Sequence, residues 1–87
     1  MHQVRLLQPA IRELQQLDKS TAARIAQRIK WLANNTDSIT PKRQTGQLAG
    51  LCKLREGDYR IIYQILHLEK TIVVHSIGHR RDIYRKK

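Results

Sequence analysis

The sequence predicts an α+β fold in a single domain of residues 1–87, with two N-terminal helices packed on an antiparallel β-sheet. In the first half, apolar residues recur at the 3.6-residue spacing of amphipathic helices. In the second half, runs of β-branched and aromatic residues are separated by short turns. A chain of 87 residues has room for one hydrophobic core. We therefore expect the element order β-α-α-β-β-β around that core.

The first half predicts a short strand and a helical hairpin. Residues 4–7 are β-prone and precede Gln8-Pro9, and proline is well placed in the first turn of a helix. Helical spacing predicts a helix from about Pro9 to Leu17, followed by a break at which Asp18 or Ser20 caps the next helix. We expect the strand at a sheet edge and the helices as an antiparallel pair. The second helix carries one apolar stripe: Ala22, Ile25, Ala26, Ile29, Leu32 and Ala33.

The second half predicts a basic loop and three strands. Residues 39–50 show no clear period, and we expect them to form an irregular surface loop. Strands are expected at residues 51–55, 59–67 and 71–78, and Glu56-Gly57-Asp58 is expected to form a three-residue hairpin turn. The stretch 59–67 is apolar on both faces, which is typical of a central strand.

Composition narrows the class of function. Seventeen lysines and arginines against seven acids give a formal net charge of +10, which attracts phosphate backbones. No apolar run has a membrane-spanning length and the N-terminus lacks the order of a secretory signal, so we expect a cytoplasmic protein that makes no membrane contact. A single cysteine, Cys52, excludes an internal disulfide, and no H-x-x-x-H or C-x-x-C spacing occurs. We expect neither a metal nor a cofactor.

Cationic side chains enter the predicted sheet. Lys53 and Arg55 are two residues apart, so their side chains point to the same face of a strand. Arg60 lies on the next strand and joins them if the register puts it on that face, whereas a one-residue slip turns it away. The alternative interpretation is that all three are ordinary solvated strand residues. A cluster of this kind on one sheet face is suited to binding a polyanion.

Two motifs carry a family resemblance. K-L-R-x-G-D-Y-R-x-x-Y-Q occupies residues 53–64, and G-H-R-R-D-x-Y-R occupies residues 78–85. Together with the helical hairpin and the lead-in L-A-G-L at residues 48–51, they resemble the RelE branch of the RelE/ParE toxin superfamily over nearly the whole chain. The resemblance implies a RelE-like microbial RNase fold and a toxin of a type II toxin–antitoxin system. It further implies a cognate antitoxin in a toxin–antitoxin hetero-oligomer, and inhibition of translation by cleavage of mRNA in the 30S ribosomal A site.

The resemblance also implies a catalytic set. The family's lysine before the Leu-Arg pair falls on Lys53, the arginine of Tyr-Arg on Arg60, the arginine after the last strand on Arg80, and the C-terminal tyrosine on Tyr84. One position departs from the pattern, because Leu51 stands where some members carry a second lysine. That departure leaves open whether catalysis is retained.

These residue types fit cleavage by attack of the 2′-OH on the adjacent phosphorus. Arg60 and Lys53 are expected to hold the phosphate and stabilise the added negative charge. Tyr84 or a lysine is expected to accept the 2′-OH proton, and Arg80 or His79 to stabilise or protonate the leaving 5′-oxygen, with Arg81 able to replace Arg80. The expected substrate-binding residues are Arg55, His79, Arg81, Lys42 and Arg43. The surface arginines Arg24 and Arg28 are candidates for rRNA contacts or simply solvated.

Two other functions remain open. A ParE-like protein of the same fold inhibits DNA gyrase without catalysis and has no need of a phosphate-cleaving set. A basic RNA-binding or ribosome-binding module without chemistry is the third possibility. In that case substitution of Arg60 or Tyr84 changes binding but abolishes no cleavage.

Overall fold

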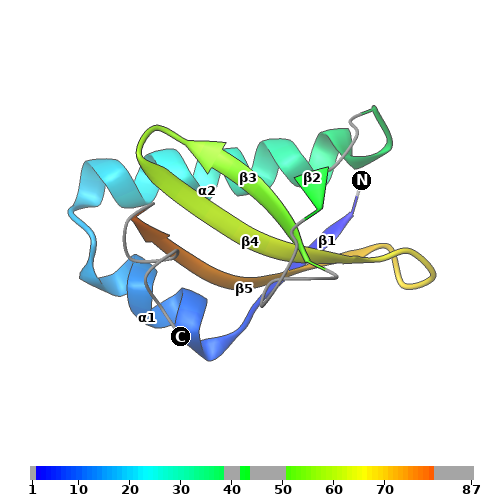
Figure 1. Ribbon diagram of the computed structural model, residues 1–87, viewed down its shortest axis with the longest axis horizontal. Coiled ribbons are helices and arrows are strands. Elements are labelled where there is room, and N and C mark those ends of the chain that lie inside the picture. Colours follow the sequence, from blue (N-terminus) through cyan, green and yellow to red (C-terminus); the bar gives the residue numbers. More distant parts are fainter. Residues whose placement is uncertain (1, 39–41, 44–50, 80–87) are drawn as a thin grey trace.

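A computed structural model describes residues 2–38, 42–43 and 51–79, which form a two-layer α+β structure. Its sheet contains five strands in the order β1-β5-β4-β3-β2 (Figure 1). The strands are β1 (Gln3–Leu6), β2 (Lys42–Arg43), β3 (Cys52–Glu56), β4 (Tyr59–Leu66) and β5 (Thr71–His79). The helices are α1 (Gln8–Gln16), α2 (Lys19–Asn35) and the short 3₁₀ helix η1 (Thr36–Ser38).

The sheet is mixed, not antiparallel throughout. β3, β4 and β5 form successive antiparallel pairs, and β4 is the central strand, as predicted. β1 lies at an edge, also as predicted, but it pairs parallel to β5 from Gln3↔Thr71 to Leu6↔Val74. The expectation of a fully antiparallel sheet is therefore wrong for this pair. β1 and β5 are joined through the whole fold and not by a hairpin, so no turn dictates their relative direction.

Two local predictions are also corrected. Residues 42–43, expected within an irregular loop, form a short antiparallel strand on β3, and a two-residue strand is too short to carry a period. Glu56 pairs directly with Tyr59, so the hairpin turn contains two residues and not three. Gly57 in that turn has a φ of +60°, which glycine adopts without steric strain.

The core lies between the helices and one face of the sheet. Ile61 and Ile77 are opposed in β4 and β5, and both are fully buried there. Four residues of the predicted α2 stripe, Ile25, Ile29, Leu32 and Ala33, lie in this core, whereas Ala22 is half-buried and Ala26 is exposed. None of the helices within the described ranges is long and apolar enough to cross a membrane. The core cluster comprises Ala10, Ile25, Ile29, Leu32, Ala33, Cys52, Ile61, Tyr63, Ile72, Val74 and Ile77.

Asp18 caps α2, which resolves the choice between Asp18 and Ser20. The Thr21 N–H donates to Asp18 Oδ2 at 3.1 Å, and the Thr21 hydroxyl donates to Oδ1 at 2.6 Å. These hydrogen bonds, first from the hydroxyl and then from the backbone, lower the pKa of Asp18 below 3.8. The carboxylate thereby satisfies one of the backbone donors that a helix N-terminus leaves unpaired.

Removal of this cap should weaken the fold in a pH-dependent way. Because the folded-state pKa of Asp18 is lowered, its contribution is present above pH 3.8 and lost as the pH falls through the folded pKa. We expect Asp18→Ala to lower the Tm at pH 7, with the gap to wild type narrowing below pH 3.8. Asp18→Asn, which keeps an acceptor oxygen, should lower the Tm less. Circular dichroism melts from pH 7 to pH 3 test this, and a gap that does not depend on pH would contradict it.

Tyr63 gives the opposite pH dependence. Its side chain is 1% exposed, and burial, with a smaller contribution from the neighbouring Cys52, raises the pKa of Tyr63 to about 12. The unfolded chain ionises this phenol near its reference pKa of 10.0, so the unfolded state binds fewer protons between these values and stability falls. We expect wild type to lose more unfolding free energy than Tyr63→Phe between pH 8 and pH 11. Urea titrations at both pH values measure the difference, and equal losses would refute this assignment.

Candidate functional site

The central strand buries an arginine on the face away from the helices. Tyr59 and Ile61, the neighbours of Arg60 in β4, both pack toward the core, so the alternation of the strand directs Arg60 to the opposite face. Arg60 is nevertheless only 5% exposed. Its Nη1 donates to the Tyr59 carbonyl at 3.2 Å, whereas its buried Nε lacks a hydrogen-bond partner in the described part of the chain. A buried donor of this kind is costly unless an acceptor reaches it.

The register brings three of the predicted cations to one face. Arg55 lies directly opposite Arg60, and Lys53 lies opposite Ile62. Opposed residues of an antiparallel pair point to the same side, so Lys53, Arg55 and Arg60 share the face away from the helices. Arg55 is exposed and Lys53 is half-buried. The sequence left open whether the register puts Arg60 on the face of Lys53 and Arg55. The observed pairing of β3 with β4 does so. We call these three residues the cation face.

The strand β2 borders this face. Its backbone pairs Lys42 with Lys53 and Arg43 with Cys52. The sequence placed both in a loop, and the pairing with β3 is what brings position 42 beside position 53.

His79 does not join the cation face. It lies opposite Tyr59 in β5, and the two rings meet edge to face with centroids 5.6 Å apart. Its neighbour Gly78 is the residue that opposes Arg60. His79 therefore lies on the helix side of the sheet, separated from the cations by the strand itself. The remaining predicted site residues, Arg80, Arg81 and Tyr84, lie outside the described residues.

Arg24 and Arg28 serve the fold. Both guanidinium groups approach the carboxylate of Glu56, with Nε–O distances of 3.6 and 3.8 Å, and Arg28 Nε donates to the Arg55 carbonyl at 3.3 Å. The Arg28 guanidinium also lies 4.3 Å from the ring centroid of Trp31. The ion pairs with Glu56 and the hydrogen bond to Arg55 connect the β3–β4 hairpin to α2. The sequence interpretation missed the role of Glu56, because its partners lie 28 and 32 residues away on a helix.

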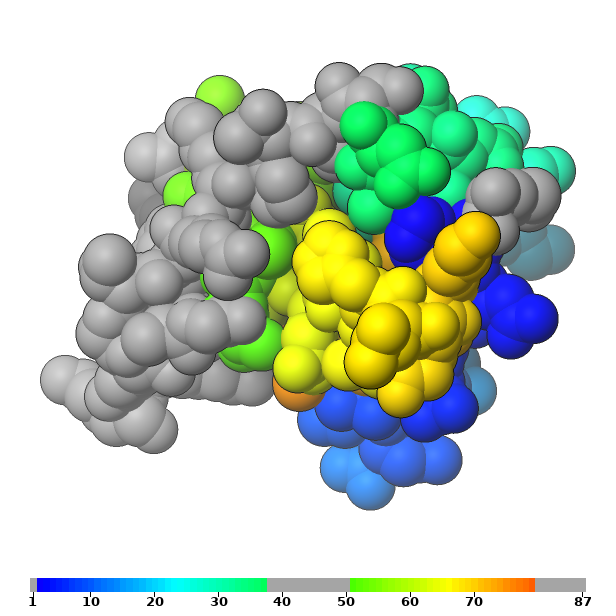
Figure 2. All heavy atoms as spheres, turned by 90° about the vertical axis from the view of Figure 1, so that its right-hand side faces the viewer, coloured from blue at the N-terminus to red at the C-terminus, as the bar shows by residue number. Residues whose placement is uncertain are grey.

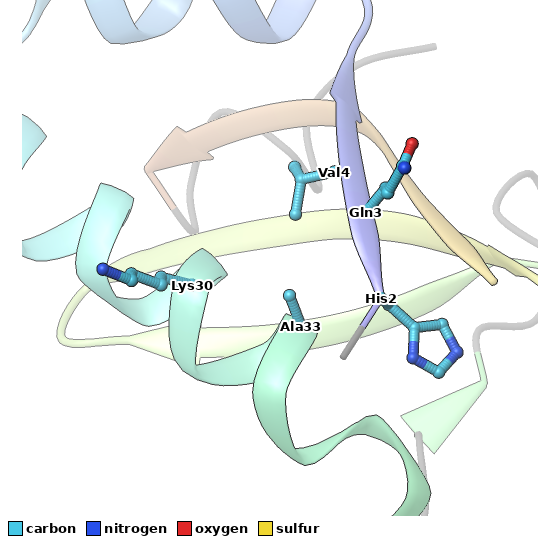
Figure 3. A pocket seen from close by; sticks show the side chains of 5 residues that line it. All are labelled: His2, Gln3, Val4, Lys30 and Ala33. Carbon is cyan, nitrogen blue, oxygen red and sulfur yellow. The ribbon is translucent and has the colours of Figure 1, made fainter.

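A hollow at the edge of the sheet is remote from the cation face. It has a volume of about 460 Å³ and lies between β1 and α2, where Val4, Lys30 and Ala33 line it (Figure 3). Gln3, also at its wall, pairs with Thr71, whereas Arg60 pairs with Gly78 at the other end of β5. The turn between β4 and β5 projects at the Thr71 end of the sheet, beside the N-terminal residues (Figure 2). Within the described ranges, no three His, Cys, Asp or Glu residues are grouped so that they could hold a metal ion.

Comparison with known proteins gives the family. Residues 4–84 match the family described as ParE toxin of type II toxin–antitoxin system, parDE. A protein of Escherichia coli described as a RelE-like toxin is 29% identical over 85 residues, which cover 95% of this chain and 90% of that protein. Toxin RelG of Mycobacterium tuberculosis is 42% identical over 40 residues, 46% of each chain.

Solved structures agree with these relatives. The chain is similar to a component of the RelBE2 toxin–antitoxin complex of Mycobacterium tuberculosis, with a TM-score of 0.79, 28% identity, and coverage of 91% of this chain and 98% of that one. The isolated RelE toxin of Escherichia coli has a TM-score of 0.75 at 14% identity, with 98% of both chains covered, and shows the same fold. The chain belongs to the ParE toxin family of type II toxin–antitoxin systems, within the RelE/ParE superfamily and on its RelE-type branch, as the two sequence motifs predicted.

Proposed function

We propose that this toxin is a ribosome-dependent endoribonuclease that cleaves mRNA in the A site and so inhibits translation. The observation that supports this most is the buried guanidinium of Arg60, which shares the cation face with Lys53 and Arg55 and whose Nε has no partner among the described residues. A planar guanidinium with donors to spare is suited to the oxygens of a phosphate. An apolar side chain could fill this buried position without the cost of desolvating a charge. Packing alone therefore does not explain an arginine here.

The reaction follows from the chemistry of the phosphodiester. The 2′-oxygen attacks phosphorus, the bond to the 5′-oxygen breaks, and the products are a 2′,3′-cyclic phosphate and a 5′-hydroxyl. Negative charge rises on the non-bridging oxygens in the transition state, where Arg60 and Lys53 stabilise it. Tyr84 or a lysine accepts the 2′-OH proton. Arg80 stabilises the leaving oxygen, which takes a proton from water to give the 5′-hydroxyl. Arg80 is favoured over His79 in this role because His79 lies on the other side of the sheet.

Substrate orientation has to come from outside the protein. The cation face brings together two arginines and one lysine on the neighbouring strands β3 and β4. A site that relies on fixed charges gains most when its substrate is already held in a reactive geometry. We propose that the ribosome supplies this geometry, which also places the protein in the cytoplasm.

We further propose that a cognate antitoxin binds this toxin in a hetero-oligomer. The similar solved structures include a toxin–antitoxin complex of Mycobacterium tuberculosis and a RelE–RelB complex of Pyrococcus horikoshii. A formal net charge of +10 favours a partner that carries acidic side chains.

A second candidate function is inhibition of DNA gyrase without catalysis. It is favoured by the description of the matching family, which is that of the ParE toxins. The two functions differ in their use of Arg60, because a purely inhibitory protein has no transition state for this residue to stabilise.

The proposed nuclease is tested on ribosomes programmed with mRNA. We expect purified toxin to create new mRNA ends in the A-site codon, detected by primer extension, and to leave naked mRNA intact. Arg60→Ala should slow cleavage ~10²–10³-fold, the usual effect of removing one donor to a developing oxyanion. Arg60→Lys keeps the charge without the fork and should be intermediate. The matched control is Arg12→Ala, which removes an exposed arginine of α1.

The controls separate the alternatives. A wild-type protein that leaves programmed ribosomes uncut refutes the nuclease, and loss of DNA supercoiling by gyrase would then support the ParE-like function. Equal cleavage by wild type and Arg60→Ala, with both proteins folded by circular dichroism, refutes the role of the cation face.

A further inference from the structure

The far end of β5 is held by a side chain in place of a strand. β1 pairs with β5 from Thr71 to Val74, so the outer edge of β5 beyond Val74 has no partner from β1. Glu13 of α1 occupies this edge. Its Oε1 accepts a hydrogen bond from the backbone N–H of Ile77 at 2.9 Å, between residues 64 positions apart in the sequence. The half-buried carboxylate therefore takes the place that the carbonyl of a neighbouring strand would hold.

This bond is stronger than the ladder bond it replaces. A backbone N–H that donates to a carboxylate forms a charge-assisted hydrogen bond, about twice as strong as one to a neutral carbonyl. Among the described residues, a hollow of about 190 Å³ lies beside this bond, with Gln16 of α1 and His79 of β5 in its wall.

The anchored residue adjoins the cation face. Ile77 pairs with Ile61, and the next residue, Gly78, pairs with Arg60. Gly78 has no side chain that could pack against the guanidinium. On this side, the neighbour of Arg60 is therefore the backbone of β5. A displacement of β5 at residue 77 moves the backbone beside Arg60 and shifts the strand end from which residues 80–87 continue.

We propose that Glu13 is a positioning residue for the nuclease reaction. It acts through Ile77 and the end of β5 and does not contact RNA. The inference rests on the proposed function, because it assigns Glu13 a role in the same cleavage. Its loss changes the geometry around Arg60 and leaves the charge of the cation face intact, so the rate constant for cleavage falls while binding to the ribosome is retained.

Two readouts test the inference on the full-length toxin. The first is amide hydrogen exchange by NMR in wild type, Glu13→Ala and Glu13→Gln. We expect the Ile77 amide to exchange about tenfold faster in Glu13→Ala, with the amides of Ile25 and Ile29 in α2 unchanged. Glu13→Gln keeps an acceptor oxygen and should restore most of the protection. Glu69→Ala, which removes an exposed acid at the β4–β5 turn, controls for the change in net charge.

The second readout is the kinetics of cleavage on programmed ribosomes. We expect Glu13→Ala to lower kcat about tenfold or more with KM unchanged, Glu13→Gln to recover most of the loss, and Glu69→Ala to equal wild type. An unchanged Ile77 amide in Glu13→Ala overturns the anchor. Faster exchange combined with unchanged kcat overturns the positioning role while the nuclease stands. A wild-type protein without cleavage refutes the proposed function itself, and the positioning role falls with it.

Discussion

The alternation of β4 is the constraint on which the rest of the structure depends. This strand lies between β3 and β5 and directs Ile61 and Tyr63 into the helix-covered core. The same alternation directs Arg60 to the other face. A slip of one residue would drive a guanidinium into the core and expose two of its largest side chains, so hydrophobic burial fixes the register strongly. The position of Arg60 beside Arg55 and Lys53 is thus a consequence of how the core packs.

β5 contains one additional residue relative to β4, which changes the side of the sheet that its following residues face. The register passes from Ile62↔Ser76 to Tyr63↔Val74, which leaves His75 as an additional residue in β5. Without it, Val74 and Ile77 could not both face the helices, because they are three residues apart. Bulges also increase local strand twist and are common beside functional sites. Here the irregularity lies two residues from Arg60, and His75 is itself engaged with Gln64 at 3.2 Å.

Periodicity predicted the parts of this structure that depend on local physics. The spacing of Ile25, Ile29 and Leu32 predicted the buried face of α2, and the apolar character of residues 59–67 predicted a central strand. Features that arise from contacts between distant segments were harder to predict from the sequence. The parallel direction of β1, the pairing of residues 42–43 with β3 and the ion pairs of Glu56 depend on partners far along the chain.

The residues of the candidate site also differ in whether local spacing or distant contacts determine their positions. The i, i+2 spacing of Lys53 and Arg55 was enough to place them together, but Arg60 joined them only through a register that the hairpin turn decides. His79 could not be placed from its motif, since the parity of β5 is shifted by the bulge at His75. Glu13 carried no signal at all, because a glutamate on an amphipathic helix is normally solvated, and its role exists only through the N–H of Ile77.

The Arg60 Nε, for which the described part of the chain offers no acceptor, connects stability with function. Burial of this charge costs folding free energy, and a formal net charge of +10 adds self-repulsion on a body of 87 residues. Such costs are typical of functional sites, where residues that destabilise the folded protein are kept because they bind a ligand. A ligand that brings anionic oxygens to this face relieves both, and because it binds the folded state it also stabilises the fold. Under the proposed function, the phosphate of the mRNA and the acidic side chains of an antitoxin are alternative sources of that relief. They would compete for one property of the toxin, a preformed cation face in which the Arg60 Nε has no hydrogen-bond partner within residues 2–38, 42–43 and 51–79.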